Sequence, residues 1–304
     1  MPRPVGGVLH SVVGFRIGGS RDRVKGVLCD CQGRSGSKGV CMDLGIRGKT
    51  ALVGGASRGL GLAICERLAT EGTNLVMVSR GADALALASK RLAAKHGIQA
   101  LAIPGDQSRG DDVERILQAA HEHFGGVDIL VHNTGGPAPG LFNDHDDGAW
   151  VEAFEGLLLS AVRMCRGVLP GMRERGYGRI VVNTSFTVKE PAPRLILSNV
   201  FRTGVVALAK TLSHEVARDG ITVNCVCPGA FDTRRLRSIF EEQARATDRT
   251  PEEVLAEWEA RIPIGRILQP KELADLVAFL ASNLARGITG GSFPIEGGML
   301  RGLF

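Results

Sequence analysis

The sequence predicts an α/β fold: a doubly wound parallel sheet of seven strands with helices on both faces. From residue 49 onward, short aliphatic and β-branched runs alternate with helical stretches, which is typical of parallel sheets. The 304 residues are 44% hydrophobic and 23% charged, which favours a large folded domain over a disordered chain or a coiled coil. A glycine-rich turn directly after the first expected strand fits the same architecture. We therefore expect one domain over residues 42–304.

Each expected strand is a short apolar run. The seven runs span residues 51–53, 75–78, 101–103, 129–131, 180–182, 221–226 and, as the weakest signal, 293–295. Between them, apolar residues recur at intervals of three and four, the spacing of amphipathic helices that pack on a sheet. Such stripes are formed by Leu60, Ile64 and Leu68, by Val113, Ile116, Leu117, Ala120 and Phe124, and by Leu208, Leu212 and Val216.

Residues 1–41 differ from the rest of the chain in charge and patterning. They contain seven basic and two acidic residues, which accounts for the net charge of +5 and leaves 30 residues of each sign in residues 42–304. Because the expected domain is neutral, its charge does not indicate nucleic acid or a membrane surface as a partner. We interpret residues 1–41 as a disordered leader, either a transit peptide or sequence that precedes a start at Met42.

The cysteines favour a cytoplasmic protein without a metal site. There are seven, an odd number, and three lie in the leader, so a secreted disulfide framework is not expected. Two C-x-C pairs, 29/31 and 225/227, could bind metal. They lack the spacing of zinc knuckles and a histidine cluster, so we favour small buried side chains. No run of about 20 apolar residues predicts a membrane span.

Residues 231–264 interrupt the alternation of strands and helices. They follow the sixth expected strand and combine many charges with Phe231, Phe240 and Trp258. We expect an inserted helical flap over the edge of the sheet, with its apolar residues lining a substrate pocket.

A candidate phosphate-binding turn runs from Gly54 to Gly61 and opens the first expected helix. Its glycines would let the backbone turn tightly and approach a pyrophosphate, whose charge the amino terminus of the helix would meet. The expected cofactor contacts are Gly55, Ser57, Arg58, Gly59, Leu60 and Gly61. The spacing differs from G-x-G-x-x-G, and a purely structural turn is the alternative.

The end of the second strand bears on the choice between NADP and NAD. Proteins that bind NAD place an acid about 20 residues past the turn, where this chain has Ser79 and Arg80. Arg80 and Arg58 could hold a 2′-phosphate through charge-assisted hydrogen bonds, whereas an acid would repel it. We predict NADP, with NAD less favoured. The alternative is that Arg80 is a solvated residue at a helix start.

Together with further motifs, these residues resemble the short-chain dehydrogenase/reductase family, close to the 3-oxoacyl-acyl-carrier-protein reductases. The further matches are Asp106, Asn133-Thr134-Gly135, Gly178-Arg179-Ile180 before Ser185, Asn224 with Pro228-Gly229 and Thr233, Ile264-Gly265-Arg266, and Glu296-Gly297-Gly298. The resemblance covers nearly all of residues 43–304. It implies a Rossmann-like domain with a nicotinamide cofactor across the carboxyl ends of the strands. The further cofactor contacts that it implies are Asp106, Gln107, Asn133, Gly135, Arg202, Pro228, Gly229 and Thr233.

The catalytic tetrad of this family, Asn, Ser, Tyr and Lys, is mostly replaced. Ser185 matches the serine, but Ser198 stands at the tyrosine position, Arg202 at the lysine position and Leu157 at the asparagine position. The only tyrosine of the chain, Tyr177, lies elsewhere in the sequence. The glycine turn also departs from the family, because Gly54 stands where a threonine is usual.

These replacements weaken acid–base chemistry more than electrostatic assistance. Ser198 could hydrogen-bond a carbonyl oxygen, but a serine is a poor proton donor at neutral pH. Arg202 remains protonated, so it could stabilise an oxyanion without shuttling protons. Lys189, four residues after Ser185, is a further candidate donor, with a simple surface charge as the alternative. The candidate catalytic residues are therefore Ser185, Ser198, Arg202 and Lys189.

Two functions are compatible with this pattern. The first is a divergent NADP-dependent oxidoreductase that acts on a small-molecule carbonyl or alcohol, and the second is a catalytically silent NADP-binding or scaffold protein. The retained cofactor motifs favour the first, and the altered tetrad favours the second. The resemblance also implies a homodimer or homotetramer, formed through the long helices expected at 147–176 and 198–218.

Overall fold

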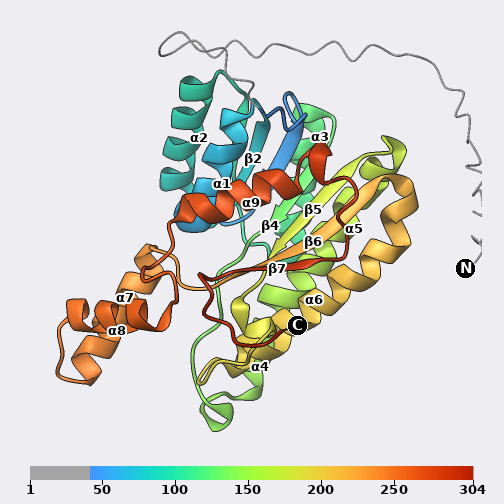
Figure 1. Cartoon of the computed structure of the whole chain (residues 1–304). Coiled ribbons are helices and arrows are strands. Elements are labelled where there is room, and N and C mark those ends of the chain that lie inside the picture. Colours follow the sequence, from blue (N-terminus) through green and yellow to red (C-terminus); the bar gives the residue numbers. More distant parts are fainter. Residues whose placement is uncertain (1–41, 304) are drawn as a thin grey trace, which may run out of the picture. The chain divides into compact units, whose positions relative to one another are not determined.

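A computed structural model describes residues 42–303, and the predicted leader at 1–41 lies outside the described residues. The chain from Leu44 onward forms one unit built on a seven-stranded sheet of order β3-β2-β1-β4-β5-β6-β7 (Figure 1). All six neighbouring pairs are parallel, which confirms the predicted doubly wound fold. The strands are β1 (Thr50–Val53), β2 (Asn74–Ser79), β3 (Ala100–Pro104), β4 (Ile129–His132), β5 (Gly178–Asn183), β6 (Ile221–Pro228) and β7 (Ser292–Ile295).

Helices connect the strands as expected for crossovers between parallel strands. The main helices are α1 (Gly59–Thr70), α2 (Ala82–His96), α3 (Gly110–Phe124), α4 (Asp147–Ala153), α5 (Ser160–Glu174), α6 (Ile196–Val216), α7 (Arg234–Ala246), α8 (Pro251–Arg261) and α9 (Pro270–Leu280). The shorter helical turns are η1 (Phe142–Asp144), η2 (Phe154–Leu159), η3 (Phe186–Val188), η4 (Ala217–Asp219) and η5 (Asn283–Ala285).

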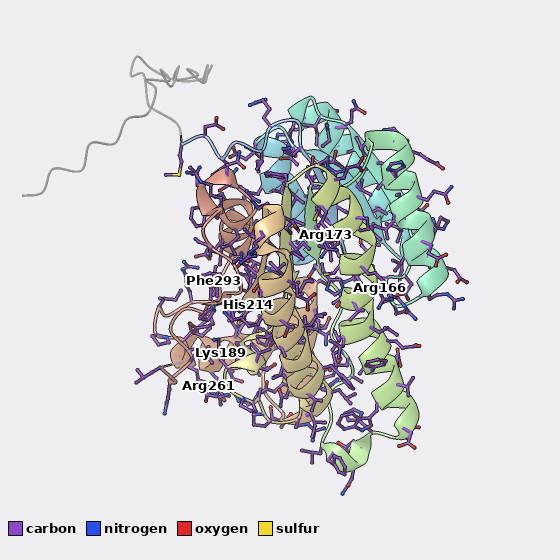
Figure 2. The ribbon with its side chains drawn as sticks, turned by 90° about the vertical axis from the view of Figure 1, so that its right-hand side faces the viewer. Arg166, Arg173, Lys189, His214, Arg261 and Phe293 are labelled. Atoms are coloured by element: carbon purple, nitrogen blue, oxygen red, sulfur yellow. The ribbon has the colours of Figure 1, made fainter. Side chains whose placement is uncertain are left out.

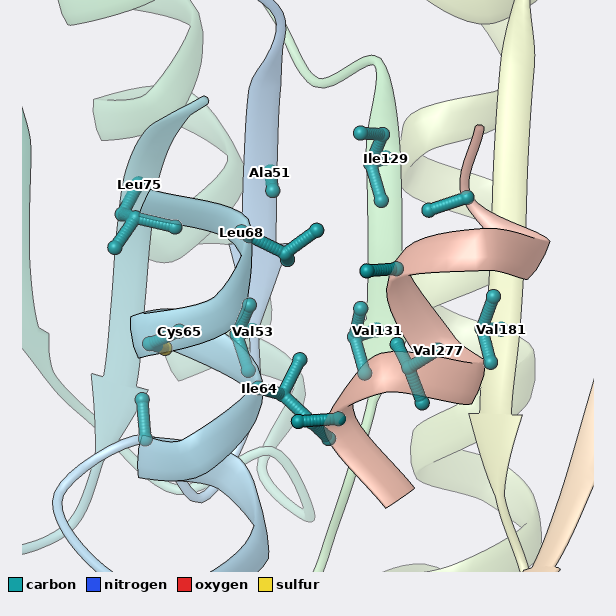
Figure 3. Close-up of a cluster of buried hydrophobic side chains, with 14 of the residues drawn as sticks. Ala51, Val53, Ile64, Cys65, Leu68, Leu75, Ile129, Val131, Val181 and Val277 are labelled. Carbon is teal, nitrogen blue, oxygen red and sulfur yellow. The ribbon is translucent and has the colours of Figure 1, made fainter. Parts of the chain in front are cut away.

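The sheet is buried on both faces by two hydrophobic clusters. Side chains of successive strand residues point to opposite faces, so Ala51 and Val53 join one cluster and Leu52 joins the other. The first cluster packs α1, α2 and α9 on the sheet, and Figure 3 shows Ile64 and Leu68 of α1 directed at the strands. The second cluster packs α3, α5 and α6 on the opposite face.

The strand order places a crevice at the carboxyl end of β1. The chain leaves β1 toward β2 on one side, and β4 pairs with β1 on the other. Ligands of open α/β sheets bind where the order reverses in this way, because the flanking loops separate there. The glycine turn after β1 and the loop after β4 therefore border the candidate site.

The long helix expected at 147–176 is divided. Residues Phe154–Leu159 form a π-helical turn between α4 and α5, and Leu157 lies buried within it. Such π-helical turns are rare in proteins, but those that occur are often found at functional sites. The departure from α-helical geometry thus coincides with the position at which the family carries its asparagine.

The expected flap contains α7 and α8, which pair as a hairpin set apart from the sheet (Figure 1). The prediction that its large apolar residues line a pocket does not fit their packing. The rings of Phe240 and Trp258 lie 5.7 Å apart inside a small cluster of the hairpin, and Phe231 packs into the first sheet cluster. Phe240 and Trp258 therefore stabilise the flap itself, whereas Phe231 packs against the sheet.

Candidate functional site

The turn after β1 needs glycine at several positions. Gly55 and Gly59 have φ angles of +59° and +57°, which favour glycine over other residues. A Cβ atom at Gly61 would lie 2.3 Å from the carbonyl oxygen of Gly55. The backbone of the turn and the first turn of α1 therefore touch, as they do in phosphate-binding turns.

The amino terminus of α1 offers free backbone donors. Arg58 is its N-cap residue and provides no side-chain cap, and the first turn contains no acid. A Cβ atom at Gly59 would contact only Thr233, at 3.7 Å, so the loop after β6 faces the turn at this point. Ser57 and Leu60 are half-buried. The glycine turn and the amino terminus of α1 together form a glycine cradle. This cradle fits a pyrophosphate, which the helix dipole would attract.

Two exposed arginines flank the carboxyl ends of β1 and β2. The Arg80 side chain is 82% exposed, and its nearest acid is Asp106, with 3.9 Å between Nη1 and Oδ2. Ser79 donates its hydroxyl hydrogen to the carbonyl oxygen of Gly81. Arg58 is exposed as well. An ion pair this long and exposed contributes little, so both arginines are available for a 2′-phosphate.

A buried amide network forms the floor of the crevice. Gln107 Nε2 donates to the carbonyl oxygen of Asn133 at 3.2 Å, and Asn133 Nδ2 donates to that of Gly54 at 3.0 Å. Asn183 Nδ2 donates to Asn133 Oδ1 at 2.7 Å. The network joins the carboxyl ends of β1, β3, β4 and β5 and fixes the loops around the cofactor position.

Gln107 explains why the chain has glycine at position 54. A Cβ atom there would lie 2.4 Å from Gln107 Nε2 and 2.5 Å from the carbonyl oxygen of Asn133. The glutamine thus occupies the space that a threonine at position 54 would need. Gln107 Oε1 is buried and has no hydrogen-bond partner among the described residues.

The loop after β6 packs against the strand beside it. The Gly229 amide donates to the carbonyl oxygen of Ile295 at 3.0 Å, and a Cβ atom at Gly229 would lie 2.6 Å from Glu296 Cβ. Pro228 is the last residue of β6. Thr233 caps α7, since its hydroxyl oxygen accepts from the Leu236 amide. Pro228, Gly229 and Thr233 therefore lie at the carboxyl end of β6, and Thr233 faces Gly59 of the glycine turn.

Three of the four candidate catalytic residues come together at the carboxyl end of β5. Arg202, on α6, donates to the carbonyl oxygens of Asn183 at 3.1 Å and Thr184 at 2.8 Å, directly before Ser185. Ser198 lies one helical turn before Arg202 and is 8% exposed. The Ser185 hydroxyl oxygen accepts from the Thr187 amide at 3.2 Å.

Arg202 is a buried cation held by carbonyl oxygens. It also donates to the carbonyl oxygen of Gly135 at 3.4 Å. Burial, and then the positive charge of Arg235, lower the pKa of Arg202 to about 10. The guanidinium remains protonated at neutral pH, as expected from the sequence, and supplies positive charge rather than a proton.

The space beside Arg202 is narrow and has both polar and apolar walls. It is lined by Arg202, Leu157, His132 and their neighbours, and its gaps do not admit a water molecule. His132 Nε2 lies 3.0 Å from the Ser160 hydroxyl. Burial, and then the charge of Arg202, lower the pKa of His132 to about 4, so its imidazole is neutral at pH 7.

Lys189 lies outside the buried group, and the single tyrosine lies at the other end of the sheet. Lys189 is exposed at the end of η3, and its side chain forms no hydrogen bond or ion pair within residues 42–303 (Figure 2). Tyr177 precedes β5 at the amino end of the sheet, with Lys49 and Arg179 over its ring at 4.1 and 4.4 Å. The phenol therefore lies at the edge of the sheet opposite Ser185.

Sequence reasoning missed Arg235. From the first turn of α7, Arg235 donates to the carbonyl oxygens of Gly136 at 3.2 Å and Pro137 at 3.4 Å. Its position two residues after Thr233 places it near the cleft. The contact itself joins residues that are 99 positions apart, and no sequence motif predicts it.

Comparisons with known proteins agree with this architecture. Residues 55–300 match the family model described as Enoyl-(Acyl carrier protein) reductase. The 3-oxoacyl-[acyl-carrier-protein] reductase of Vibrio cholerae is 34% identical, and the match covers 84% of this chain and 99% of that protein. The chain belongs to the short-chain dehydrogenase/reductase family.

Two solved structures are similar over nearly their whole length. L-sorbose reductase from Gluconobacter frateurii, complexed with NADPH and L-sorbose, superimposes with a TM-score of 0.84 at 35% identity. That match covers 86% of this chain and 100% of the reductase. An actinorhodin polyketide ketoreductase variant with NADPH superimposes with a TM-score of 0.79 at 35% identity, covering 83% of this chain and 97% of that protein.

Metal-binding clusters and membrane-spanning helices are both absent from residues 42–303. No group of three or more His, Cys, Asp or Glu side chains in this part of the chain could hold a metal ion. None of its helices is both long and apolar enough to cross a bilayer.

Proposed function

We propose that the protein is an NADP-dependent oxidoreductase that transfers hydride between nicotinamide and a carbonyl or alcohol substrate. The observation that carries the proposal is the position of Arg202, a protonated guanidinium beside Ser185 and Ser198 at the carboxyl end of β5, next to the glycine cradle. Two similar structures contain NADPH, and one similar protein reduces a 3-oxoacyl group. These likenesses support an active enzyme over a silent scaffold.

The cofactor would lie across the carboxyl ends of the strands. Its pyrophosphate would accept hydrogen bonds from the amide groups of Gly59 to Gly61. Its 2′-phosphate would bind Arg58 and Arg80. Its adenine would contact Asp106 and Gln107. Asn133, Gly135, Pro228, Gly229 and Thr233 would border its nicotinamide half. Bound NADPH supplies the hydride that reduces the carbonyl carbon.

The chain's own residues would act on the carbonyl oxygen. The hydroxyl groups of Ser185 and Ser198 would hydrogen-bond this oxygen, and the nearby charge of Arg202 would stabilise the negative charge that develops on it. The proton that completes the alcohol would come from Ser198, from Lys189 or from solvent. Because none of these is a tuned general acid, we expect turnover about 10² to 10⁴ times slower than with such an acid.

The experiment measures NADPH binding and NADPH oxidation separately. Binding is measured by calorimetry, and oxidation is followed by absorbance with diketones, quinones and 3-oxoacyl thioesters. Wild type should bind and oxidise NADPH, whereas Ser185→Ala and Arg202→Met should reduce turnover by about 10-fold or more. Binding without turnover above the Ser185→Ala background would favour the silent protein. An absence of saturable binding would contradict both functions.

The proposal includes a homo-oligomer. Figure 2 looks onto α5 and α6, whose exposed side carries Arg166, Arg173 and His214. Next to this pair, three neighbouring elements each expose an apolar side chain: Val151 on α4 is 56% exposed, Phe154 on η2 is 38% exposed and Val200 on α6 is 46% exposed. Such a patch favours association with a second copy through these helices.

We also propose that the enzyme works in the cytoplasm. The four cysteines of the described part, Cys65, Cys165, Cys225 and Cys227, are all free and buried. Free thiols are usual in a reducing compartment.

A further inference from the structure

Two arginines from different helices converge on one loop of the candidate site. Arg202, on α6, donates to the carbonyl oxygen of Gly135, and Arg235, on α7, donates to those of Gly136 and Pro137. Gly135 and Gly136 are consecutive, and the Cα atoms of consecutive residues lie about 3.8 Å apart. The two guanidinium groups are thus held close together after β4.

Neither arginine is neutralised by a carboxylate. Within residues 42–303, no ion pair includes Arg202 or Arg235, although other arginines of the same side have acidic partners. The nearest acid in sequence, Asp232, is engaged by Arg237, whose Nε and Nη2 donate at 2.8 and 2.9 Å. The pair therefore carries two positive charges without a counter-ion from the described protein.

The hydrogen bonds to the loop leave donors unused. A guanidinium has five N–H groups, and Arg202 makes three hydrogen bonds to carbonyl oxygens. Two of its N–H groups have no partner in the described part of the chain. Arg235 makes two hydrogen bonds, both to carbonyl oxygens. Unused donors on buried or converging cations favour an oxygen anion as ligand.

There is space for such a ligand beside the loop. A Cβ atom at Gly135 would meet no atom within 4 Å, whereas one at Gly136 would lie 3.0 Å from Arg235 Nη2. The loop is therefore open at Gly135 and covered by Arg235 at the next residue. The uncovered residue is the one whose carbonyl oxygen accepts from Arg202, and the covered residue is the one whose carbonyl oxygen accepts from Arg235.

We propose that Arg202 and Arg235 bind an anionic oxygen group, and that this group is a carboxylate carried by the substrate, so that the enzyme reduces oxo acids. The inference rests on the proposed function. A hydride from NADPH and a proton add across the carbonyl group, giving a hydroxy acid and NADP⁺, and the carboxylate is unchanged. A phosphate group of the cofactor has the same chemistry, and the experiment distinguishes the two sources.

The experiment compares acids with their neutral esters. Pyruvate, acetoacetate and levulinate, each beside its methyl ester, are titrated calorimetrically into the protein alone and into the protein saturated with NADP⁺. The variants are Arg235→Gln, which removes the charge, and Arg235→Lys, which keeps it. Arg237→Gln is the matched control, because it removes an equal charge two residues away that Asp232 already neutralises.

We expect wild type to bind at least one acid about 10-fold more tightly than its ester. Arg235→Gln should abolish that preference, Arg235→Lys should retain part of it, and Arg237→Gln should leave it unchanged. Steady-state reduction should show the same preference as a change in KM.

Three results would overturn the inference. Equal binding of acid and ester by wild type would contradict a carboxylate as the ligand. The absence of binding by every acid would contradict it as well. Equal effects of Arg235→Gln and Arg237→Gln on the preference for acids would show that this preference depends only on the overall positive charge of the protein. If Arg235→Gln instead weakens NADPH binding about 10-fold and leaves the preference for acids intact, the anion belongs to the cofactor. Failure of NADPH to bind would contradict the proposed function, while the acid titration of the protein alone would still be informative.

Discussion

At the scale of single residues, His132 links the reaction centre to the pH dependence of stability. Its imidazole is buried at the end of β4, and its pKa is lowered from an ordinary value of 6.5 to about 4, first by burial and then by the charge of Arg202. Unfolding restores the ordinary value, so the unfolded chain binds the extra proton more readily than the folded protein does.

We expect this residue to destabilise the protein in acid. As the pH falls from about 6.5 to about 4, His132 should remove up to about 3 kcal/mol of the free energy of unfolding. Urea titrations of wild type and His132→Gln at several pH values measure the difference. Glutamine can keep a hydrogen bond to Ser160 but does not titrate, so its stability should fall less over this window. Parallel pH profiles for the two proteins would contradict the assignment.

Gly54 and Gln107 form a coupled pair on the floor of the crevice. Gly54→Thr restores the residue that is usual in the family, but its Cβ atom would clash with Gln107 Nε2 and with the carbonyl oxygen of Asn133. We expect a loss of about 1 to 3 kcal/mol in the free energy of unfolding, measured by urea denaturation.

Adding Gln107→Val to Gly54→Thr should recover part of this loss, because it removes one clash and frees the Asn133 carbonyl group to move. Gly81→Ala is the control, since a Cβ atom at Gly81 meets nothing within 4 Å. Additive effects of the two substitutions at positions 54 and 107 would show that they are not coupled.

At the scale of elements, the hairpin of α7 and α8 is the part most separate from the sheet. Its own cluster contains Phe240, Val254 and Ile262, so its stability depends on local contacts. Helix α8 begins with a capping box, in which Glu253 N donates to the Thr250 hydroxyl at 3.2 Å and Thr250 N donates to the Glu253 carboxylate at 2.9 Å. The capping box therefore holds this end of α8 closed, and its loss should promote local opening of the hairpin.

Thr250→Ala should destabilise α8 by about 1 kcal/mol and loosen the flap. If the flap covers the substrate, KM should rise while the dissociation constant of NADPH stays unchanged. Hydrogen exchange should increase within Pro251–Arg261 and not in the sheet. Thr247→Ala serves as control, because the Thr247 hydroxyl only donates back to Gln243 in the preceding turn. An equal rise in KM for both variants would exclude a specific role of the cap.

The elements differ in how well the sequence predicts them. All seven strands are found within two residues of their expected ends, because a parallel sheet requires continuous apolar runs. The division of the helix at Phe154–Leu159 had no such signal, since a π-helical turn keeps the same apolar residues. The packing of Phe240 on Trp258 was also missed, because an apolar residue in a sequence does not reveal which surface it covers.

The candidate site shows the same limit. The glycine turn could be predicted from local spacing, whereas Ser185, Ser198 and Arg202 followed from the resemblance to the family; all of them lie at or beyond the carboxyl ends of the strands. The exclusion of a side chain at Gly54 by Gln107, and the reach of Arg235 to Gly136, depend on contacts between distant segments. Such contacts follow from the fold and not from any single motif.

At the scale of the whole molecule, the exposed apolar residues beside α4 bear on assembly. We expect wild type to form a homo-oligomer and Val200→Asp to shift it toward the monomer, because a carboxylate in an apolar interface loses its hydration. Light scattering after size-exclusion chromatography measures the mass. Leu87→Asp is the control, since Leu87 is 72% exposed on α2 and belongs to another face. A monomeric wild type at micromolar concentration would contradict the proposed assembly.

Tyr177 gives the molecule a built-in optical reporter. Its phenol is the only one in the chain, and its ring contacts Lys49 and Arg179 at the end of the sheet far from Ser185. Nitration of this ring, or its change in absorbance in alkali, therefore reports only on whether the end of the sheet around Tyr177 is folded. Chemical modification of phenols should therefore leave the surroundings of Ser185 untouched, because Ser198 stands where the resemblance implies a tyrosine.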